Sequence, residues 1–283
     1  MGRQKRLAAV HDISCFGRCS LTVALPIISA AGIEVSCVPT AVLSTHTGGF
    51  TDYTYRDLTE DMPLIIAHWE KLALEFDAIY TGYLGSFAQL DIVADMFDRL
   101  AGEETAIVVD PVMADNGKLY PAFSSEFPAG MRKLCSQADV IVPNMTEAAL
   151  LLDEPYKEGP YTEKYIDGIV ERLTGLGPQR VVLTGVYFDD ELLGAAYRDG
   201  GRAETRYMMA RKVPGSYHGT GDVFASALAA GTVNGLAMEA AVRAAVDFTV
   251  GSIERTHRAG TDIRYGVDFE TCLPDFIRDV LTQ

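Results

Sequence analysis

Short apolar runs alternate with longer amphipathic stretches along most of the chain. Residues 7–13 (LAAVHDI) predict a buried strand, and residues 20–32 (SLTVALPIISAAG) predict a helix that ends at a glycine. Further strands are predicted at residues 33–40, 77–84, 105–112, 138–144 and 180–185, and further helices at residues 63–76, 90–102, 146–152 and 163–177. Apolar strands that alternate with helices are typical of a mostly parallel sheet covered by helices on both faces.

The pattern changes after Gly185. Residues 191–213 contain two alternating runs around the turn signal at residues 199–201 (DGG), which predicts a β-hairpin. Two last helices are predicted at residues 236–256 and 269–283. Because no Pro/Ser-rich linker, repeat or low-complexity tract divides the chain, we expect residues 1–283 to form a single three-layer α/β/α domain.

The net charge of the chain limits the classes of partner that it is expected to bind. Its 24 basic and 39 acidic residues give a net charge of −15, and no long basic run offsets it. Nucleic acid and anionic membrane surfaces are therefore not expected as partners. The five scattered cysteines form no CxxC pair, and no apolar run is long enough to span a bilayer. These features predict a protein of the reducing cytoplasm, with Cys15 and Cys19 as small buried residues.

Almost every polar or glycine-rich stretch follows a predicted strand. The residues concerned are Asp12, Ser14, Thr45, His46, Thr47, Tyr83, Asp110, Asp115, Asn144, Glu147 and Thr184. Because right-handed crossovers place the carboxyl ends of parallel strands along one edge of a sheet, these residues should converge there. The clustering predicts a small-molecule enzyme site.

The segment HGTGD (residues 218–222) opens an apolar, alanine-rich run. Gly219, Thr220 and Gly221 can turn backbone N–H groups into a concavity, and the positive end of the following helix would add to it. Such an array stabilises a transferred phosphoryl group, and Asp222 beside it could accept the proton of an attacking hydroxyl. The tetrapeptide alone is equally consistent with Asp222 as an ordinary helix N-cap.

Asp110, Asn144 and Glu147 offer the hard oxygen ligands that suit Mg²⁺. Asn144 and Glu147 stand three residues apart at the start of a predicted helix, so they share a face. The alternative is a capping box, with Asn144 as the N-cap residue and Glu147 as its partner.

The residues after the first three strands could orient a polar aromatic ligand. They are Asp12, Ser14, Thr45, His46, Thr47 and Tyr83. Tyr83 could stack on a ring, although each of these residues alone is more often a turn or core residue. His11, His68 and Trp69 are interpreted as packing residues, and His218 as either functional or loop packing. No Walker A, GxGxxG, GxSxG or HExxH motif is present, which disfavours the corresponding nucleotide-binding and hydrolase classes.

Five segments in this order resemble the motifs of the pyridoxal kinase group within the ribokinase-like superfamily. They are LSTHTGG, TGYLGS, DPVMADNGKLY, PNMTEAALL and HGTGDVFASAL, and the resemblance covers about residues 8–256. The set is specific, whereas a single motif is not. The resemblance implies ATP-dependent phosphorylation of the 5′-hydroxymethyl group of pyridoxal, pyridoxamine or pyridoxine.

The resemblance also implies roles for residues by position. It makes Asp222 the catalytic base, with Gly219, Thr220 and Gly221 as the anion hole. The residues implied at the ATP phosphates are Thr184, Asn144, Glu147 and Asp115, and those implied at Mg²⁺ are Asp110 and Glu147. Tyr83 and His46 would line the pyridine site, with Thr47 beside them. Members of the family often use a monovalent cation such as K⁺ and are commonly homodimers.

The first loop, HDISCFGRCSL, departs from the pyridoxal kinase pattern. It is shorter and carries Asp12 where the family usually has a serine, which resembles the hydroxymethylpyrimidine kinases of thiamin synthesis. Their S-G-G-A-G-I-Q-A-D run is missing, and Ala114 stands where glycine is usual. A hydroxymethylpyrimidine kinase, a sugar kinase and a non-catalytic vitamer-binding protein therefore stay open, although the presence of Asp222 disfavours the last.

Overall fold

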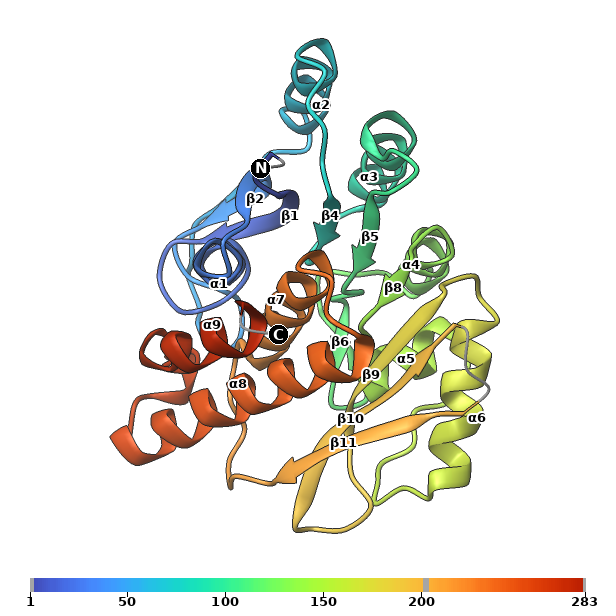
Figure 1. The fold of residues 1–283 in the computed structure, drawn as a ribbon, viewed down its shortest axis with the longest axis vertical. Helices are drawn as coiled ribbons and strands as arrows, with labels where there is room; N and C mark the ends of the chain where they lie inside the picture. Colours follow the sequence, from blue (N-terminus) through green and yellow to red (C-terminus); the bar gives the residue numbers. More distant parts are fainter. Residues whose placement is uncertain (1–2, 201–203, 282–283) are drawn as a thin grey trace.

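The computed structural model describes residues 3–200 and 204–281 and contains a central sheet of nine strands in the order β11-β10-β9-β8-β5-β4-β1-β2-β3 (Figure 1). The strands are β1 (Arg6–Ser14), β2 (Glu34–Leu43), β3 (Tyr55–Asp57), β4 (Ala78–Thr81), β5 (Ala106–Val109), β8 (Val140–Ile141), β9 (Arg180–Val186), β10 (Leu192–Asp199) and β11 (Arg206–Arg211). A separate two-stranded sheet joins β6 (Ala114–Asp115) to β7 (Lys118–Leu119). In Figure 1 the large sheet runs from blue β2 to orange β11.

The middle of the sheet is parallel. β1 pairs in parallel with β2 and β4, and parallel pairing continues through β5 and β8 to β9. Only the edges are antiparallel, where β3 joins β2 and the hairpin of β10 and β11 joins β9. The carboxyl ends of the parallel strands therefore share one edge of the sheet, as the sequence predicts.

Helices cover both faces of the sheet. The helices that pack around one buried cluster are α1 (Leu21–Ala30), α7 (Thr220–Val233), α8 (Met238–Ala259) and α9 (Leu273–Leu281). The helices of the other face are α2 (Met62–Lys71), α3 (Phe87–Leu100), α4 (Phe127–Cys135), α5 (Met145–Leu151) and α6 (Glu163–Thr174). Two short 3₁₀ helices, η1 (Ile263–Tyr265) and η2 (Glu270–Cys272), precede α9. The predicted three-layer α/β/α architecture is confirmed.

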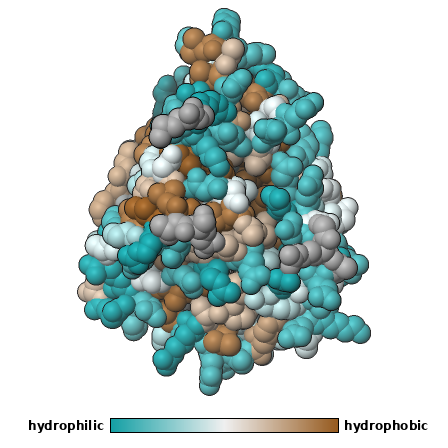
Figure 2. Space-filling view, in the orientation of Figure 1, coloured by the Kyte–Doolittle hydropathy of each residue, from teal (hydrophilic) through white to brown (hydrophobic). Residues whose placement is uncertain are grey.

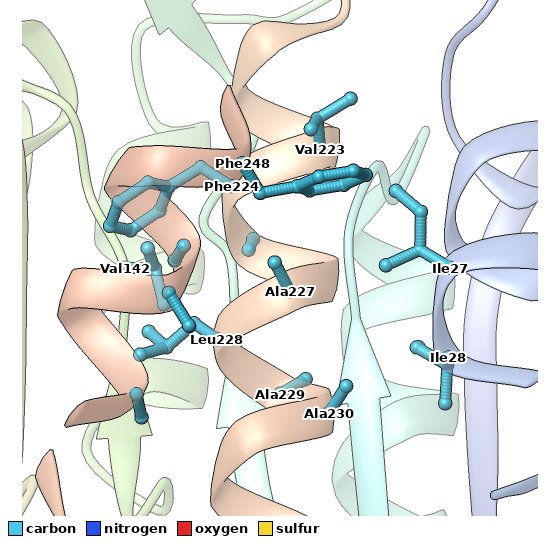
Figure 3. Packing of buried hydrophobic residues seen from close by; sticks show 14 of the residues in the cluster. Ile27, Ile28, Val142, Val223, Phe224, Ala227, Leu228, Ala229, Ala230 and Phe248 are labelled. Carbon is cyan, nitrogen blue, oxygen red and sulfur yellow. The ribbon is translucent and has the colours of Figure 1, made fainter. Parts of the chain in front are cut away.

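Helix α7 lies in the buried layer between α1 and α8. Its small side chains allow close packing, and a Cβ atom on Gly231 would lie only 3.1 Å from the Cβ of Ala241 in α8. Figure 3 shows Ile27 and Ile28 of α1 on one side of α7, with Leu228 directed toward the other side. This tight burial fixes the helix axis, so the amino end of α7 is held rigidly at the carboxyl edge of the sheet.

Several elements differ from the sequence prediction. Helix α2 ends at Lys71 instead of reaching residue 76, because Ala73 adopts a left-handed conformation with φ of 50° that ends the helix. β3, β6, β7 and α4 were not predicted, since they are short or contain Pro and Gly. The predicted hairpin is confirmed, although Gly201 of its turn lies outside the described residues, and the predicted C-terminal helix begins as η2.

The surface view in Figure 2 is largely polar, with hydrophobic residues gathered in smaller groups between polar ones. Among the described helices, none combines the length and the apolar character needed to cross a membrane.

We expect Leu228→Ala to destabilise the protein strongly. Leu228 is fully buried in α7, so the substitution leaves a cavity that should lower the free energy of unfolding by about 2–5 kcal/mol. Urea denaturation followed by circular dichroism measures this loss. The matched control is Leu64→Ala in α2, where the side chain is 70% exposed and the change should stay within about 0.5 kcal/mol. Equal effects of the two substitutions would contradict the burial argument.

Candidate functional site

Five carboxylates meet along the carboxyl edge of the sheet. They are Asp12 in β1, Asp110 after β5, Asp115 in β6, Glu147 in α5 and Asp222 in α7, and we call them the acidic row. Neighbours in the row influence one another: Asp12 raises the pKa of Asp222, Asp222 and Glu147 raise that of Asp110, and Asp115 raises that of Glu147. Within residues 3–200 and 204–281, no basic side chain forms an ion pair with any of them.

The amino end of α7 forms an open cradle of backbone. Its N-cap residue, Gly219, has a left-handed φ of 74°, and a Cβ atom there would lie 2.1 Å from the carbonyl oxygen of Arg18. A Cβ atom on Gly221 would meet no heavy atom within 4 Å, so Gly221 borders open space. The N–H groups and the positive end of the helix suit an anion at this place.

Asp222 lies in the first turn of α7 and is partly accessible. Because Gly219 is the N-cap residue and α7 has no side-chain cap, the interpretation of Asp222 as an N-cap is wrong. Burial raises the pKa of Asp222 to about 7, the charge of Asp12 contributes to the rise, and the N–H of Ser20 opposes it. A carboxylate with this pKa beside an open anion cradle suits a general base near neutral pH.

Asp12 lies at a β-bulge of β1, where the register with β2 shifts between His11 and Ile13. A bulge redirects side chains, and here Asp12 is 5% exposed and faces the row. Its carboxylate accepts a hydrogen bond of 3.1 Å from the Ser14 hydroxyl. Burial raises the pKa of Asp12, while the hydroxyls of Ser20 and Ser14 lower it.

Asn144 and Glu147 form the capping box of α5, which confirms the structural alternative. The Asn144 side chain accepts the N–H groups of Thr146 and Glu147 at 2.8 and 2.9 Å and donates to the Ala114 carbonyl at 2.9 Å. Glu147 accepts N–H groups of Asn144 and Met113 at 2.8 and 3.2 Å. Burial still raises the pKa of Glu147 to about 8.

Asp110 is buried and accepts no side-chain hydrogen bond within the described ranges. Burial, followed by the charges of Glu147 and Asp222, raises its pKa well above the ordinary range. A buried carboxylate without a donor fits a bound cation. No group of three His, Cys, Asp or Glu residues forms a ready metal cage in the part of the chain described here. Two carboxylates fit Mg²⁺, which commonly completes its shell with water and substrate phosphates.

Thr184 and the hairpin that carries Asp115 both contact the start of α5. Thr184 of β9 forms a parallel bridge with Asn144, and its hydroxyl lies 3.4 Å from the Pro143 carbonyl. Asp115 is exposed in the β6–β7 hairpin, which is attached to α5 by a 2.9 Å hydrogen bond from Gly117 N–H to the Thr146 hydroxyl. The structure therefore brings the four residues expected at the ATP phosphates together.

His46 has a structural role that the sequence did not reveal. Its Nε2–H donates to the Arg264 carbonyl at 2.5 Å, and its Nδ1 accepts from Gly48 N–H at 3.1 Å. A Cβ atom on Gly17 would lie 2.8 Å from the ring, so His46 ties three loops together. Both ring nitrogens are engaged within the chain, which leaves the ring itself, rather than a hydrogen bond, to face a ligand. The His218 ring lies 5.4 Å from that of His46, which favours the packing interpretation of His218.

The remaining substrate candidates lie on nearby loops. Thr45 has a buried hydroxyl with no hydrogen-bond partner in the described chain, whereas Thr47 is exposed. The half-buried Tyr83 packs 5.6 Å from the Phe123 ring, and burial, the Tyr55 phenol and the charge of Asp12 raise its pKa. The Tyr83 phenol therefore stays protonated and senses the charge of Asp12.

Sequence reasoning missed several neighbours of the site. Tyr120 ends the motif DPVMADNGKLY and could have been found from it; burial and the charges of Glu147 and Asp115 raise its pKa. Tyr55 lies in the short strand β3, which carries no periodic signal, and burial, followed by the charges of Asp57 and Asp12, raises its pKa.

A C-terminal segment, residues 262–270, also lies beside the first loop. Arg18 donates its N–H to the Tyr265 carbonyl at 3.0 Å, and its side chain pairs with Asp268 and Glu270 at 3.0 and 2.6 Å. No local pattern marks this contact. In the same loop Cys19 is buried as predicted, but Cys15 is exposed, so its prediction as a buried residue is wrong.

Of the residues predicted to be packing residues, some are buried in the structure and one is exposed. His11 is fully buried against the Tyr80 ring at 4.4 Å, which agrees with its structural interpretation. Trp69 packs 5.3 Å from Phe76, whereas His68 lies on the exposed face of α2, so the packing role predicted for His68 is wrong.

Comparison with known proteins identifies the family. Residues 25–266 match the family described as phosphomethylpyrimidine kinase. A candidate phosphomethylpyrimidine kinase from Bacteroides thetaiotaomicron VPI-5482, solved with pyridoxal, is 40% identical with a TM-score of 0.92 and coverage of 97% of this chain and 96% of its own. Pyridoxal kinase from Lactobacillus plantarum is 34% identical with a TM-score of 0.88 and coverage of 98% and 97%.

Among curated proteins, the hydroxymethylpyrimidine/phosphomethylpyrimidine kinase of Escherichia coli K12 is 30% identical over 225 residues, which cover 76% of this chain and 77% of that protein. The family match and these similarities along nearly the whole chain agree with the fold and with the ordered motifs. The chain therefore belongs to the pyridoxal kinase and phosphomethylpyrimidine kinase family of the ribokinase-like superfamily.

Proposed function

We propose that this protein transfers the γ-phosphoryl group of ATP to the 5′-hydroxymethyl group of a B6 vitamer: pyridoxal, pyridoxamine or pyridoxine. The observation that carries the proposal is Asp222, whose pKa is raised to about 7, at the edge of the open cradle formed by Gly219, Thr220 and Gly221. The 40% identical relative solved with pyridoxal supports the choice of ring.

The reaction follows from the placement of these groups. Asp222 accepts the proton of the hydroxymethyl group as its oxygen forms a bond to the γ-phosphorus. The bond from that phosphorus to the bridging β-γ oxygen breaks, and ADP leaves with the bond's electron pair. The N–H groups of the first turn of α7 would stabilise the charge on the transferred group, and Gly221 in that turn borders open space.

The ATP phosphates would lie between the cradle and the start of α5, where Thr184, Asn144 and Asp115 are placed. Asp110 and Glu147 would hold Mg²⁺, which neutralises phosphate charge when it is bound. Both ATP and Mg²⁺ belong to the proposal, and a monovalent cation, a homodimer and a cytoplasmic location stay predictions.

The vitamer ring would lie near Asp12 and the wall of Tyr83 and Phe123. Tyr83 offers an aromatic face, and Asp12, Ser14, Thr45 and Tyr83 offer polar groups. The exposed Thr47 and the ring of His46 border this region.

Hydroxymethylpyrimidine is the second candidate substrate. The family match and the Escherichia coli relative favour it, and so does Asp12, which resembles the aspartate of that group's first loop. Both reactions phosphorylate a hydroxymethyl group on a six-membered nitrogen ring, so the same base and cradle serve either substrate.

A substrate panel tests the proposal. We expect ADP formation with at least one of pyridoxal, pyridoxamine and pyridoxine, measured by a coupled assay and by mass of the product. Asp222→Asn should lower kcat by about 10²–10⁴-fold because it removes the base. Its circular dichroism spectrum and melting temperature serve as the folding control. Turnover of hydroxymethylpyrimidine but of no B6 vitamer would select the second candidate. If neither the vitamers nor hydroxymethylpyrimidine are turned over, both candidate functions are wrong.

The pH profile tests the role of Asp222. The base must be ionised to accept a proton, and its pKa is raised to about 7, so kcat/KM should fall about tenfold per pH unit below that value. Asp12→Asn removes a charge that raises the pKa of Asp222, so the acidic limb should move to lower pH. The ionisation of each vitamer, followed by absorbance, provides the correction. An acidic limb at the same pH in both proteins would contradict the coupling of Asp12 to Asp222.

Two neighbouring glycines should respond differently to alanine. Gly221→Ala should fold normally, because a Cβ atom there meets nothing within 4 Å, but it should lower kcat about 10²-fold by filling the phosphate space. Gly219→Ala should lower the free energy of unfolding by more than about 2 kcal/mol, because φ is 74° and the new Cβ atom would clash with Arg18. Full activity of Gly221→Ala would show that the phosphoryl group lies elsewhere.

A further inference from the structure

Gln89 is a fully buried glutamine that uses both ends of its side-chain amide. It lies in the first turn of α3 and is 0% exposed. Its carbonyl oxygen accepts the N–H of Gly85 at 2.7 Å, and its nitrogen donates to the Thr40 carbonyl at 3.0 Å and to the Thr59 hydroxyl at 2.9 Å. A flipped amide would place N–H against N–H and oxygen against oxygen, so these partners determine its orientation.

An ordinary helix cap does not account for these hydrogen bonds. Ser86 is the N-cap residue of α3, and its hydroxyl accepts the N–H of Gln89 at 3.3 Å. In a capping box, a glutamine at this position would accept the N–H of the N-cap residue in return. Gln89 instead bonds to Gly85, one residue before the cap, and reaches β2 and the residue Thr59 after β3. Its side chain therefore joins the loop after β4 to two other segments.

A second hydrogen bond fixes the same loop. Thr40 of β2 is fully buried, and its hydroxyl donates to the Tyr83 carbonyl at 3.2 Å. The carbonyl of Thr40 accepts the amide of Gln89, which in turn holds Gly85. Residues 83–85 are therefore attached to β2 at both ends, at Tyr83 directly and at Gly85 through Gln89.

Gly85 is the point at which this loop meets the aromatic side chains of the site. A Cβ atom on Gly85 would lie 3.0 Å from the Tyr55 hydroxyl oxygen, 3.5 Å from the Tyr83 ring and 3.7 Å from the Gln89 carbonyl oxygen. Tyr83 also packs 5.6 Å from the Phe123 ring. Such close packing leaves the loop little room to move, provided that its backbone hydrogen bonds are kept.

We propose that Gln89 is a positioning residue for the vitamer ring: it holds the backbone of residues 83–85 so that Tyr83 keeps its place beside the ring. This inference rests on the proposed function, in which Tyr83 offers an aromatic face to the vitamer. Because Gln89 is fully buried, it acts through Tyr83 and not by contact with the substrate. Contact with a part of the substrate that does not react contributes equally to binding of the substrate and of the transition state, so its loss should raise KM and leave kcat unchanged.

The test uses Gln89→Met and Thr40→Val. Methionine has nearly the length of glutamine without its donors and acceptor, and valine has the shape of threonine without the hydroxyl. We expect the KM for pyridoxal to rise about tenfold in Gln89→Met and about threefold in Thr40→Val, with kcat and the KM for ATP within about twofold. Calorimetric titration with pyridoxal in the absence of ATP should show the same loss of affinity. Hydroxymethylpyrimidine replaces pyridoxal in both measurements if the substrate panel selects it.

The matched control is Ser86→Ala, which removes the cap of α3 and leaves the partners of the Gln89 amide in place. It should lower the melting temperature by roughly 2–4 °C and leave the KM for pyridoxal within about twofold. A double-mutant cycle supplies a second readout. In a Tyr83→Ala background, Gln89→Met should raise KM less than twofold further, because the residue through which Gln89 acts is gone.

The outcomes separate the two proposals. Wild-type turnover with unchanged KM and pyridoxal affinity in Gln89→Met and Thr40→Val would overturn the positioning role and leave the proposed function standing. The positioning role is also wrong if Ser86→Ala raises KM as much, or if the full effect of Gln89→Met persists in the Tyr83→Ala background. If Gln89→Met does not fold, Thr40→Val decides. A wild-type protein that turns over no substrate, but whose binding of pyridoxal is weakened by these variants, would overturn the proposed transfer and keep the role of Gln89. Absence of both binding and turnover would overturn both.

Discussion

Repulsion among the carboxylates of the acidic row, of which Asp12, Asp110 and Glu147 are buried, is the constraint on which the site depends. Burying several like charges without basic partners is costly, and the described chain offsets this cost in limited ways. Glu147 accepts backbone N–H groups, Asp222 lies at the positive end of α7, and the pKa values of both acids are raised. Among the described residues, Asp110 has no such partner. Under the proposed function, the row would oppose a bare polyphosphate and favour a nucleotide that arrives with a divalent cation.

The rigidity of the fold makes this arrangement possible. Helix α7 is packed too tightly between α1 and α8 to move away from the sheet, and the C-terminal segment holds the first loop through Arg18. His46 joins that segment to the loop after β2. Asp222 is consequently held by a packed helix and Asp12 by a bulged strand.

The sequence predicts the parallel sheet and its functional edge because these depend on local periodicity and on the handedness of crossovers. It also predicts, as one of two interpretations, the capping box of Asn144 and Glu147, because these two residues lie within one helical turn. It does not decide whether Asp222 is an N-cap, because the left-handed Gly219 is set by contact with Arg18, 201 residues earlier in the chain. The same reason hides the hydrogen bond between the His46 ring and the Arg264 carbonyl. These features arise from contacts between segments that are distant in sequence, which no local pattern encodes.

The charge pattern around the ring region bears on the choice between the two substrate classes. A B6 vitamer near neutral pH can carry a protonated ring nitrogen and an ionised 3-hydroxyl group, so it needs an acceptor at one edge and donors at another. The Asp12 carboxylate is an acceptor, whereas the raised pKa values of Tyr83 and Tyr55 keep both phenols protonated as donors. Thr45 adds a buried hydroxyl with no partner of its own in the described chain. A hydroxymethylpyrimidine has an amino group that could donate a hydrogen bond to Asp12. It has no anionic oxygen to accept hydrogen bonds from the tyrosine and threonine hydroxyls. Under the proposed function, these donors beside the Asp12 acceptor favour the zwitterionic pyridine ring, and this complementarity is our reason for placing a B6 vitamer first.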